Sequence, residues 1–241
     1  EKWQGDRVFQ FFERQMAYTG ARADPPPDLV VWPETSVPFL LDRDDGGLAM
    51  IADEGRGATV ALGIQRTEGA RIFNSLAVIA PGGAVADVYD KHHLVPFGEY
   101  IPLGDLIDDH LSIRAFAAQA GFGYSDGPGA RVMNLGPIGK VLPLICYEAV
   151  FPRDLRVAPE RADWILQVTN DAWFGNLSGP FQHLAQARMR AVEQGLPLLR
   201  SANTGVSAII DARGRIVHSL ALNSAGYLDG PVPPALPPTP Y

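Results

Sequence analysis

Residues 141–168, VLPLICYEAVFPRDLRVAPERADWILQV, indicate the fold. They begin with a short apolar run at 141–146, continue through a stretch of helical character at 148–158 and end in a second apolar run at 163–168. Runs that are apolar throughout, with no alternation of polar residues, are typical of strands buried on both faces. The stretch therefore predicts a β-α-β unit in a sheet that helices or a second sheet cover on each side.

Similar segments recur along the rest of the chain. Further strands are expected at residues 29–32, 58–64, 73–80, 196–201 and 206–211. Further helices are expected at 6–19, 44–55 and 180–194. Turns with the composition of hairpins lie at 81–83 and 212–214. Because helical and direct connections between strands are mixed, the sequence predicts an α/β fold built as a layered sandwich.

The composition excludes several classes of protein. With 46% hydrophobic and 20% charged residues, the 241-residue chain is globular in character. A net charge of −7 argues against nucleic-acid binding, which needs a basic surface to meet phosphates. The single cysteine excludes an intrachain disulfide and a multi-cysteine metal site. No apolar run reaches about 18 residues, so no transmembrane helix is expected within the sequence.

Three reactive side chains each follow an apolar run. Glu34 lies in VVWPETSVP, Lys91 in VYDKHHLVPFGEYIP and Cys146 after VLPLI. We expect them to meet at one sheet edge, with side-chain tips within about 3–5 Å of one another. A carboxylate in an apolar pocket can deprotonate a thiol, and an ammonium beside a backbone N–H stabilises an oxyanion. Together the three residues predict covalent acyl transfer through a thioester.

Each of these residues also has a structural explanation when it is considered alone. Taken alone, Cys146 is better explained as a small buried hydrophobe. Glu34 can equally be an acid at a helix N-terminus, and Lys91 can belong to a solvated turn. If Cys146 opens a helix, the backbone N–H groups there are expected to lower its pKa. The neighbouring His92 and His93 lack the spacing of a helical metal pair, so no zinc site is expected.

Longer phrases carry a resemblance to a known superfamily. WPE, DKHHLVPFGEYIP, LICYE and NDAWFG resemble the nitrilase, or carbon–nitrogen hydrolase, superfamily with its Glu-Lys-Cys triad. The phrase TNDAWFGNLSGPFQHLAQARMRAVEQGLPLLRSANTG (169–205) is most similar to the apolipoprotein N-acyltransferase branch. The resemblance covers nearly the whole chain and implies an αββα sandwich.

The resemblance also implies how the chain is organised. Residues 1–229 would form the catalytic domain, and the Pro-rich residues 230–241 a linker toward a membrane helix. Neither the family's first strand, which precedes the position of Lys2 and Trp3, nor its membrane helices are found in this sequence. We therefore expect the chain to be the extracytoplasmic part of a longer protein of the cell inner membrane, with its catalytic domain on the periplasmic side.

The resemblance assigns roles to particular residues. Glu34 would be the general base, Lys91 the oxyanion-stabilising lysine and Cys146 the nucleophile. The supporting residues would be Glu99, which orients Lys91 or assists proton transfer, Tyr147, whose backbone N–H completes the oxyanion hole, and Glu148 behind the nucleophile. The aromatic residues near the acyl-chain entrance would be Trp173 and Phe174. No metal and no cofactor are implied.

The implied reaction moves an acyl chain from a phospholipid, through a thioester on Cys146, to the N-terminal amine of a diacylglyceryl-cysteine lipoprotein, with the enzyme acting as a monomer. One alternative is a soluble nitrilase-type amidase that uses the same triad with water as acceptor. Another is an inactive binding module, which would be expected to lack a triad residue. Residues 100–130 are expected to form a lid, helical at 105–119, with an apolar surface made by Leu103, Leu106, Ile107, Leu111, Ile113 and Phe116.

Overall fold

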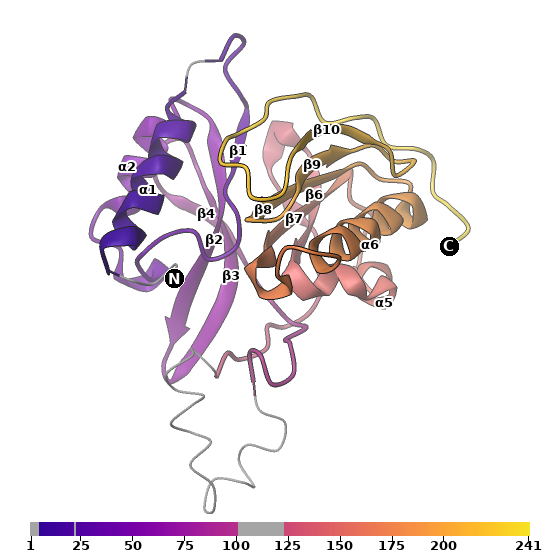
Figure 1. Ribbon diagram of the computed structural model, residues 1–241, viewed down its shortest axis with the longest axis horizontal. Helices are drawn as coiled ribbons and strands as arrows, with labels where there is room; N and C mark the ends of the chain where they lie inside the picture. The colour runs from indigo at the N-terminus through magenta and orange to yellow at the C-terminus, as the bar shows by residue number, and fades with distance from the viewer. Residues whose placement is uncertain (1–4, 22, 101–122) are drawn as a thin grey trace, which may run out of the picture.

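Two β-sheets pack face to face, and helices cover the outer face of each sheet (Figure 1). The computed structural model describes residues 5–21, 23–100 and 123–241. Helices α1 (Gly5–Thr19) and α2 (Gly47–Glu54) cover the first sheet. Helices α5 (Pro152–Arg156) and α6 (Gly179–Gln194) cover the second. The αββα sandwich expected from the sequence is therefore confirmed.

The first sheet is formed by the N-terminal half of the chain. In the described residues its order is β1 (Leu29–Val31), β2 (Thr59–Glu68), β3 (Arg71–Ile79) and β4 (Val85–Asp90). Strand β1 runs parallel to β2, whereas β2, β3 and β4 form an antiparallel meander. The short helix η1 (Leu41–Arg43) precedes α2 on the way from β1 to β2.

The second sheet contains the β-α-β unit that the sequence predicts. Its order among the described residues is β10 (Ile216–Leu220), β9 (Ser207–Ile210), β8 (Leu198–Asn203), β7 (Trp164–Asn170), β6 (Lys140–Ile145) and β5 (Met133–Asn134). Strands β6, β7 and β8 are parallel. Strand β5 pairs antiparallel with β6, β9 pairs antiparallel with β8, and β10 pairs antiparallel with β9. Three short helices flank these strands: η2 (Gly136–Ile138), η3 (Cys146–Val150) and η4 (Asp171–Phe174).

The apolar runs are continuous because both faces of the inner strands are buried. Between the sheets, Leu76 and Tyr89 of the first pack in one cluster with Ile145 and Val168 of the second. The opposite face of the second sheet packs on α6, for example through Leu184. Burial on both sides explains why the sequence shows little alternation in these strands.

The sequence differs from the structure mainly at short elements. The helix expected over 148–158 is two helices, η3 and α5, because Pro152 forces Phe151 into an extended conformation (φ −104°, ψ 106°). The edge strand β5 is not among the expected strands, because it has only two residues. The hairpin turn expected at 212–214 joins β9 to β10, most of which is exposed. The expected helix 105–119, with its apolar residues, lies outside the described residues.

The Pro-rich tail 230–241 lies along the second half of the molecule (Figure 1). The backbone N–H of Leu236 donates to the carbonyl of Gly195 at 2.8 Å, and Arg161 donates to the carbonyl of Leu236 at 2.7 Å. None of the helices in the described ranges is long and apolar enough to cross a membrane.

Candidate active site

Cys146 lies at the junction of β6 and η3, as the first residue of the short helix. It is 6% exposed and has a positive φ of 50°, a conformation that residues other than glycine rarely adopt. Such strain persists only where the surroundings enforce it, and it is concentrated at functional sites. The end of a buried parallel strand thus presents the only cysteine of the chain in a strained turn.

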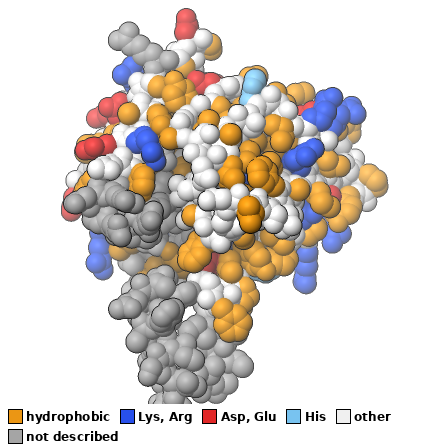
Figure 2. Space-filling view, in the orientation of Figure 1, with side chains coloured by type: hydrophobic (Ala, Val, Ile, Leu, Met, Phe, Trp, Pro, Cys, Tyr) orange, Lys and Arg blue, Asp and Glu red, His pale blue; other side chains and the backbone are white. Residues whose placement is uncertain are grey.

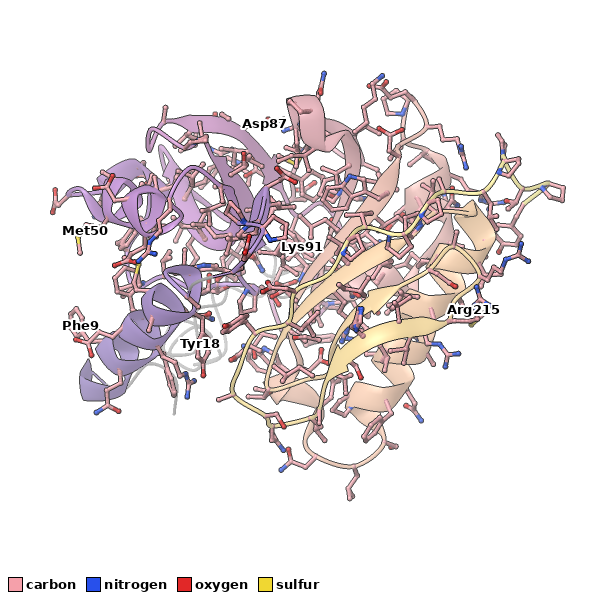
Figure 3. All side chains as sticks on the ribbon, turned by 90° about the horizontal axis from the view of Figure 1, so that it is seen from above. Phe9, Tyr18, Met50, Asp87, Lys91 and Arg215 are labelled. Carbon is pink, nitrogen blue, oxygen red and sulfur yellow. The ribbon has the colours of Figure 1, made fainter. Side chains whose placement is uncertain are left out.

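Lys91 follows β4 and lies between the two halves of the molecule (Figure 3). Its side chain is 1% exposed, and its Nζ is 2.8 Å from Oε1 of Glu99 and 3.7 Å from Oε1 of Glu34. A buried ammonium needs such partners, because removing an unpaired charge from water is very costly. The structure therefore brings Glu34, Lys91 and Glu99 together at one site.

Both carboxylates are held by donors that the sequence analysis did not identify. Asn74, inside β3, donates from Nδ2 to Oε1 of Glu34 at 2.7 Å and to Oε1 of Glu99 at 3.1 Å. The backbone N–H of Asn170, at the end of β7, donates to Oε2 of Glu34 at 2.8 Å. Glu34 is thereby fixed by one donor from each sheet.

A close approach of two backbones sets the position of Glu34. Gly63 in β2 packs against the chain at Pro33 and Glu34, where an added Cβ would lie 2.5 Å from Cα of Glu34. Thr35, the next residue, has a positive φ of 48°. The turn that presents Glu34 therefore requires a glycine in the neighbouring strand.

Charge and burial act together on the Cys146 thiol. Burial, followed by the negative charge of Glu34, raises its pKa to about 12, although Lys91 and a hydrogen bond with Thr169 act in the opposite direction. The expectation that helix N–H groups lower this pKa is therefore wrong, because burial outweighs them. The resting site holds a neutral thiol beside a carboxylate.

Lys91 remains an ammonium in this site. Burial alone would lower its pKa, but the negative charges of Glu34 and Glu99 and the hydrogen bond to Glu99 act against burial, and the pKa lies above its ordinary value. A fixed positive charge next to a nucleophile is suited to stabilise an oxyanion that develops on a substrate carbonyl.

Glu148 connects the lysine segment to the cysteine segment. It is fully buried, and its Oε2 accepts the backbone N–H of Ile145 at 2.7 Å. Its Oε1 accepts the backbone N–H of His92 at 2.8 Å and the hydroxyl of Tyr89 at 2.9 Å. One carboxylate thus positions the residue before Cys146 and the residue after Lys91.

The other expected residues lie around this centre. Tyr147 is the second residue of η3, where the first N–H groups have no partner within the helix, and its ring packs edge-on against Phe151. Trp173 and Phe174, in η4, are 71% and 41% exposed. Leu177 is also exposed, and hydrophobic side chains gather on the half of the surface formed by the second sheet and its helices (Figure 2).

Tyr124 also belongs to this region, although sequence reasoning gave it no role. Its hydroxyl is hydrogen-bonded by Gln65. Burial first, and then the charges of Glu34 and Glu99, raise the pKa of Tyr124 to about 12. In the sequence, Asn74 stands out as a polar residue inside the apolar run 73–80. No comparable pattern in the sequence points to Tyr124.

The described side chains do not include a group of three or more His, Cys, Asp or Glu residues that could hold a metal ion. The site instead combines a thiol, a carboxylate fixed by two donors and a buried ammonium. These groups are the components of nucleophilic attack on an acyl carbon, with proton transfer and oxyanion stabilisation.

Sequence comparison finds similar proteins named apolipoprotein N-acyltransferase. One from Rhodopseudomonas palustris is 45% identical over an alignment of 221 residues that covers 88% of this chain and 41% of the relative. Another from Sinorhizobium fredii is 43% identical over an alignment of 240 residues that covers 94% of this chain and 44% of the relative. The chain thus spans less than half the length of these curated relatives.

Solved structures share the fold at low identity. A carbon-nitrogen hydrolase from Helicobacter pylori has a TM-score of 0.66 at 16% identity and covers 88% of this chain and 80% of its own. An amidase from Nesterenkonia has a TM-score of 0.64 at 18% identity and covers 89% and 81%. The sequence profile of the family described as Carbon-nitrogen hydrolase matches residues 10–236. The chain therefore belongs to the carbon–nitrogen hydrolase family.

Proposed function

We propose that this chain is the catalytic part of an apolipoprotein N-acyltransferase, with Cys146 as nucleophile, Glu34 as general base and Lys91 as oxyanion stabiliser. One observation carries the proposal. A buried thiol, ammonium and carboxylate share one site, in a chain 40–45% identical to relatives of that name. The neutral thiol beside Glu34 is the ground state that general-base activation requires.

In the first half-reaction Cys146 takes an acyl chain from a phospholipid. Glu34 accepts the thiol proton while Sγ bonds to the ester carbonyl carbon. Lys91 and the backbone N–H of Tyr147 stabilise the oxyanion. The ester C–O bond then breaks and the proton passes from Glu34 to the departing glycerol oxygen, leaving a thioester and a lysophospholipid. Glu99 and Glu148 hold Lys91 and the Cys146 turn in place.

In the second half-reaction the acceptor is the N-terminal amine of a diacylglyceryl-cysteine lipoprotein. The amine nitrogen attacks the thioester carbonyl and gives a proton to Glu34. The C–S bond breaks, and the same proton returns to the sulfur of Cys146. Because the site is buried, water is a poor competitor for the thioester.

The surroundings of the site fit a lipid substrate. Trp173 and Phe174 supply exposed aromatic surface next to it, and Leu177 is 85% exposed. A net charge of −7 gives no general attraction to anionic lipid, so contact with the bilayer is made by apolar side chains and by membrane segments elsewhere in the protein. We place the enzyme in the inner membrane as a monomer, with this domain on the periplasmic side.

The test separates acyl transfer from hydrolysis. The full-length protein is incubated with phospholipid alone, and the tryptic peptide 141–153 is examined by mass spectrometry. A fatty-acyl increment should accumulate on Cys146 and disappear when a synthetic diacylglyceryl-cysteine peptide is added, with the acyl chain appearing on its amine. Cys146→Ala should show no increment.

A different result would favour the amidase alternative. If the wild-type protein shows no increment and releases free fatty acid or ammonia steadily without an amine acceptor, water is its acceptor. The transferase proposal is then wrong, although Cys146 would remain the nucleophile.

A further inference from the structure

The backbone carbonyl of Cys146 faces a buried charged cluster that the acyl-transfer chemistry does not use. Nε2 of His183 lies 3.0 Å from this carbonyl oxygen, and Nδ1 of His183 lies 2.9 Å from Oδ1 of Asp171. The other oxygen of Asp171 forms a 2.6 Å ion pair with Arg200. His183, Asp171 and Arg200 are each at most 3% exposed. We call these three residues the His183 cluster.

The His183 cluster is rigid because three elements and a close backbone contact hold it. His183 comes from α6, Asp171 opens η4 and Arg200 lies in β8. Nε of Arg200 also donates to the carbonyl of Val206 at 3.2 Å. At Gly205 an added Cβ would lie 2.1 Å from Oδ2 of Asp171, so the chain closes directly over this carboxylate.

The carbonyl oxygen of Cys146 can only accept hydrogen bonds, so Nε2 of His183 is the donor in this contact. Gln167 donates to the same carbonyl from Nε2 at 3.3 Å, and its Oε1 accepts from Arg200 at 2.6 Å, which fixes the orientation of its amide. The carbonyl oxygen of Cys146 therefore receives two donors, one from His183 and one from Gln167.

Other side chains hold the His183 ring in place. The groups in contact with it are Asp171 and the Phe174 ring of η4, Arg200 of β8, Gln167 of β7 and Cys146 of η3. Contacts from four elements around one ring leave it little freedom to turn away from the Cys146 carbonyl.

We propose that His183 is a positioning residue that holds the carbonyl of Cys146, and with it the strained backbone turn that aims the thiol at Glu34. The proposal rests on the proposed role of Cys146 as nucleophile. Glu148 holds the residue before Cys146 through the N–H of Ile145, and His183 holds Cys146 itself from the other side. A positive φ at a non-glycine residue persists only when neighbouring contacts enforce it. Without His183 the turn can relax and move the sulfur away from the base.

Two variants of one residue separate positioning from packing. His183→Gln keeps an amide donor near the position of Nε2, and His183→Asn keeps one near the position of Nδ1.

In the full-length protein, single-turnover acylation of Cys146 by p-nitrophenyl acetate is followed on peptide 141–153. His183→Asn should lower the acylation rate constant by about 10- to 100-fold with little change in half-saturating ester concentration, because misplacement of a reacting group costs rate. His183→Gln should stay within about threefold of wild type, since its Cys146 contact remains.

The possible outcomes distinguish the positioning role of His183 from the proposed acyltransferase function. If the two variants acylate at equal rates, whether fast or slow, the positioning role is overturned. The activated ester needs no lipid recognition, so acylation by it together with failure on phospholipid would refute only the proposed function. If wild-type Cys146 is not acylated even by this ester, both proposals fail.

A measurement on the wild-type protein avoids any folding defect of the variants. The ¹⁵N resonance of Nε2 in the labelled His183 ring should lie in the protonated range at neutral pH, with the His183→Gln protein identifying it by its absence. An unprotonated Nε2 would overturn the inferred hydrogen bond to the Cys146 carbonyl.

Discussion

Glu34 is held by contacts from both sheets, and this gives it the geometry of a base. Its Oε1 accepts from Asn74 in β3, and its Oε2 accepts the backbone N–H of Asn170 at the end of β7. Nζ of Lys91 lies 3.7 Å from the same Oε1. In the proposed mechanism, a carboxylate fixed in this way would not need to reorganise to accept the thiol proton.

We expect Glu34→Gln to abolish acyl-Cys146 formation while the protein remains folded. The side chains have nearly the same shape, but the amide cannot accept the thiol proton. Loss of a general base lowers rates by about 10² to 10⁴. The rate of acyl increment on peptide 141–153 measures this effect. Glu68→Gln, which removes the same charge at an exposed position at the end of β2, should leave the rate unchanged. Equal rates for Glu34→Gln and wild type would exclude Glu34 as the base.

The sequence predicted some residues of this site better than others. Glu34, Lys91 and Cys146 could be singled out because each reactive group directly follows an apolar run. Asn74 and His183 could not, because a single polar residue within a strand or helix has many explanations until its partners are known. The pKa of Cys146 was misjudged because burial, which opposes the helix N–H groups, depends on the packing of both sheets.

At the scale of elements, the close contact between β2 and the chain that follows β1 sets the position of Glu34. Strand β1 ends at Val31, and the chain then passes Gly63 of β2 at backbone contact distance before Glu34. The parallel pairing of β1 with β2 and the helical turns after β6 follow from the apolar runs and from Pro152. The contact at Gly63 could not be predicted from the sequence, because nothing in the sequence shows which segment packs against a glycine within an apolar run.

We expect Gly63→Ala to damage both stability and catalysis. The new methyl group would lie 2.6 Å from the carbonyl oxygen of Pro33 and from the backbone N of Thr35, so the chain at Glu34 must move. Overpacking of this kind costs about 1–3 kcal/mol of unfolding free energy, and a displaced base slows acylation. Denaturant unfolding and the acylation rate measure the two effects. Gly82→Ala, in the turn between β3 and β4, meets open space and should change stability by less than about 0.5 kcal/mol. If Gly63→Ala acylates like wild type, Gly63 does not set the position of Glu34.

For the whole molecule, burial of the thiol between two sheets makes stability depend on alkaline pH. Burial and the charge of Glu34 raise the pKa of Cys146 from 9.0 to about 12. Above pH 9 the unfolded chain therefore loses the thiol proton while the folded chain retains it. The unfolded state then binds fewer protons, so the free energy of unfolding falls as pH rises.

We expect this loss to be about 1.4 kcal/mol per pH unit at most between pH 9 and pH 12. Cys146→Ala lacks the group, so its stability relative to wild type should improve as pH rises above 9. Urea unfolding of both proteins at pH 7, 9, 10 and 11 tests this difference. Lys91, whose pKa is also raised, contributes to the alkaline loss in both proteins. A stability difference that stays constant from pH 7 to 11 would contradict a raised thiol pKa.

The bond between Asn170 and Glu34 joins residues 136 positions apart in the chain, and Glu148 reaches 59 positions back to Tyr89. During synthesis, the ribosome releases the segment with Glu34 and Lys91 long before the segment with Cys146 and Asn170. Neither half alone places Glu34 beside the sulfur of Cys146. The site therefore does not exist in a chain that is only partly synthesised, and it forms when the two sheets come together.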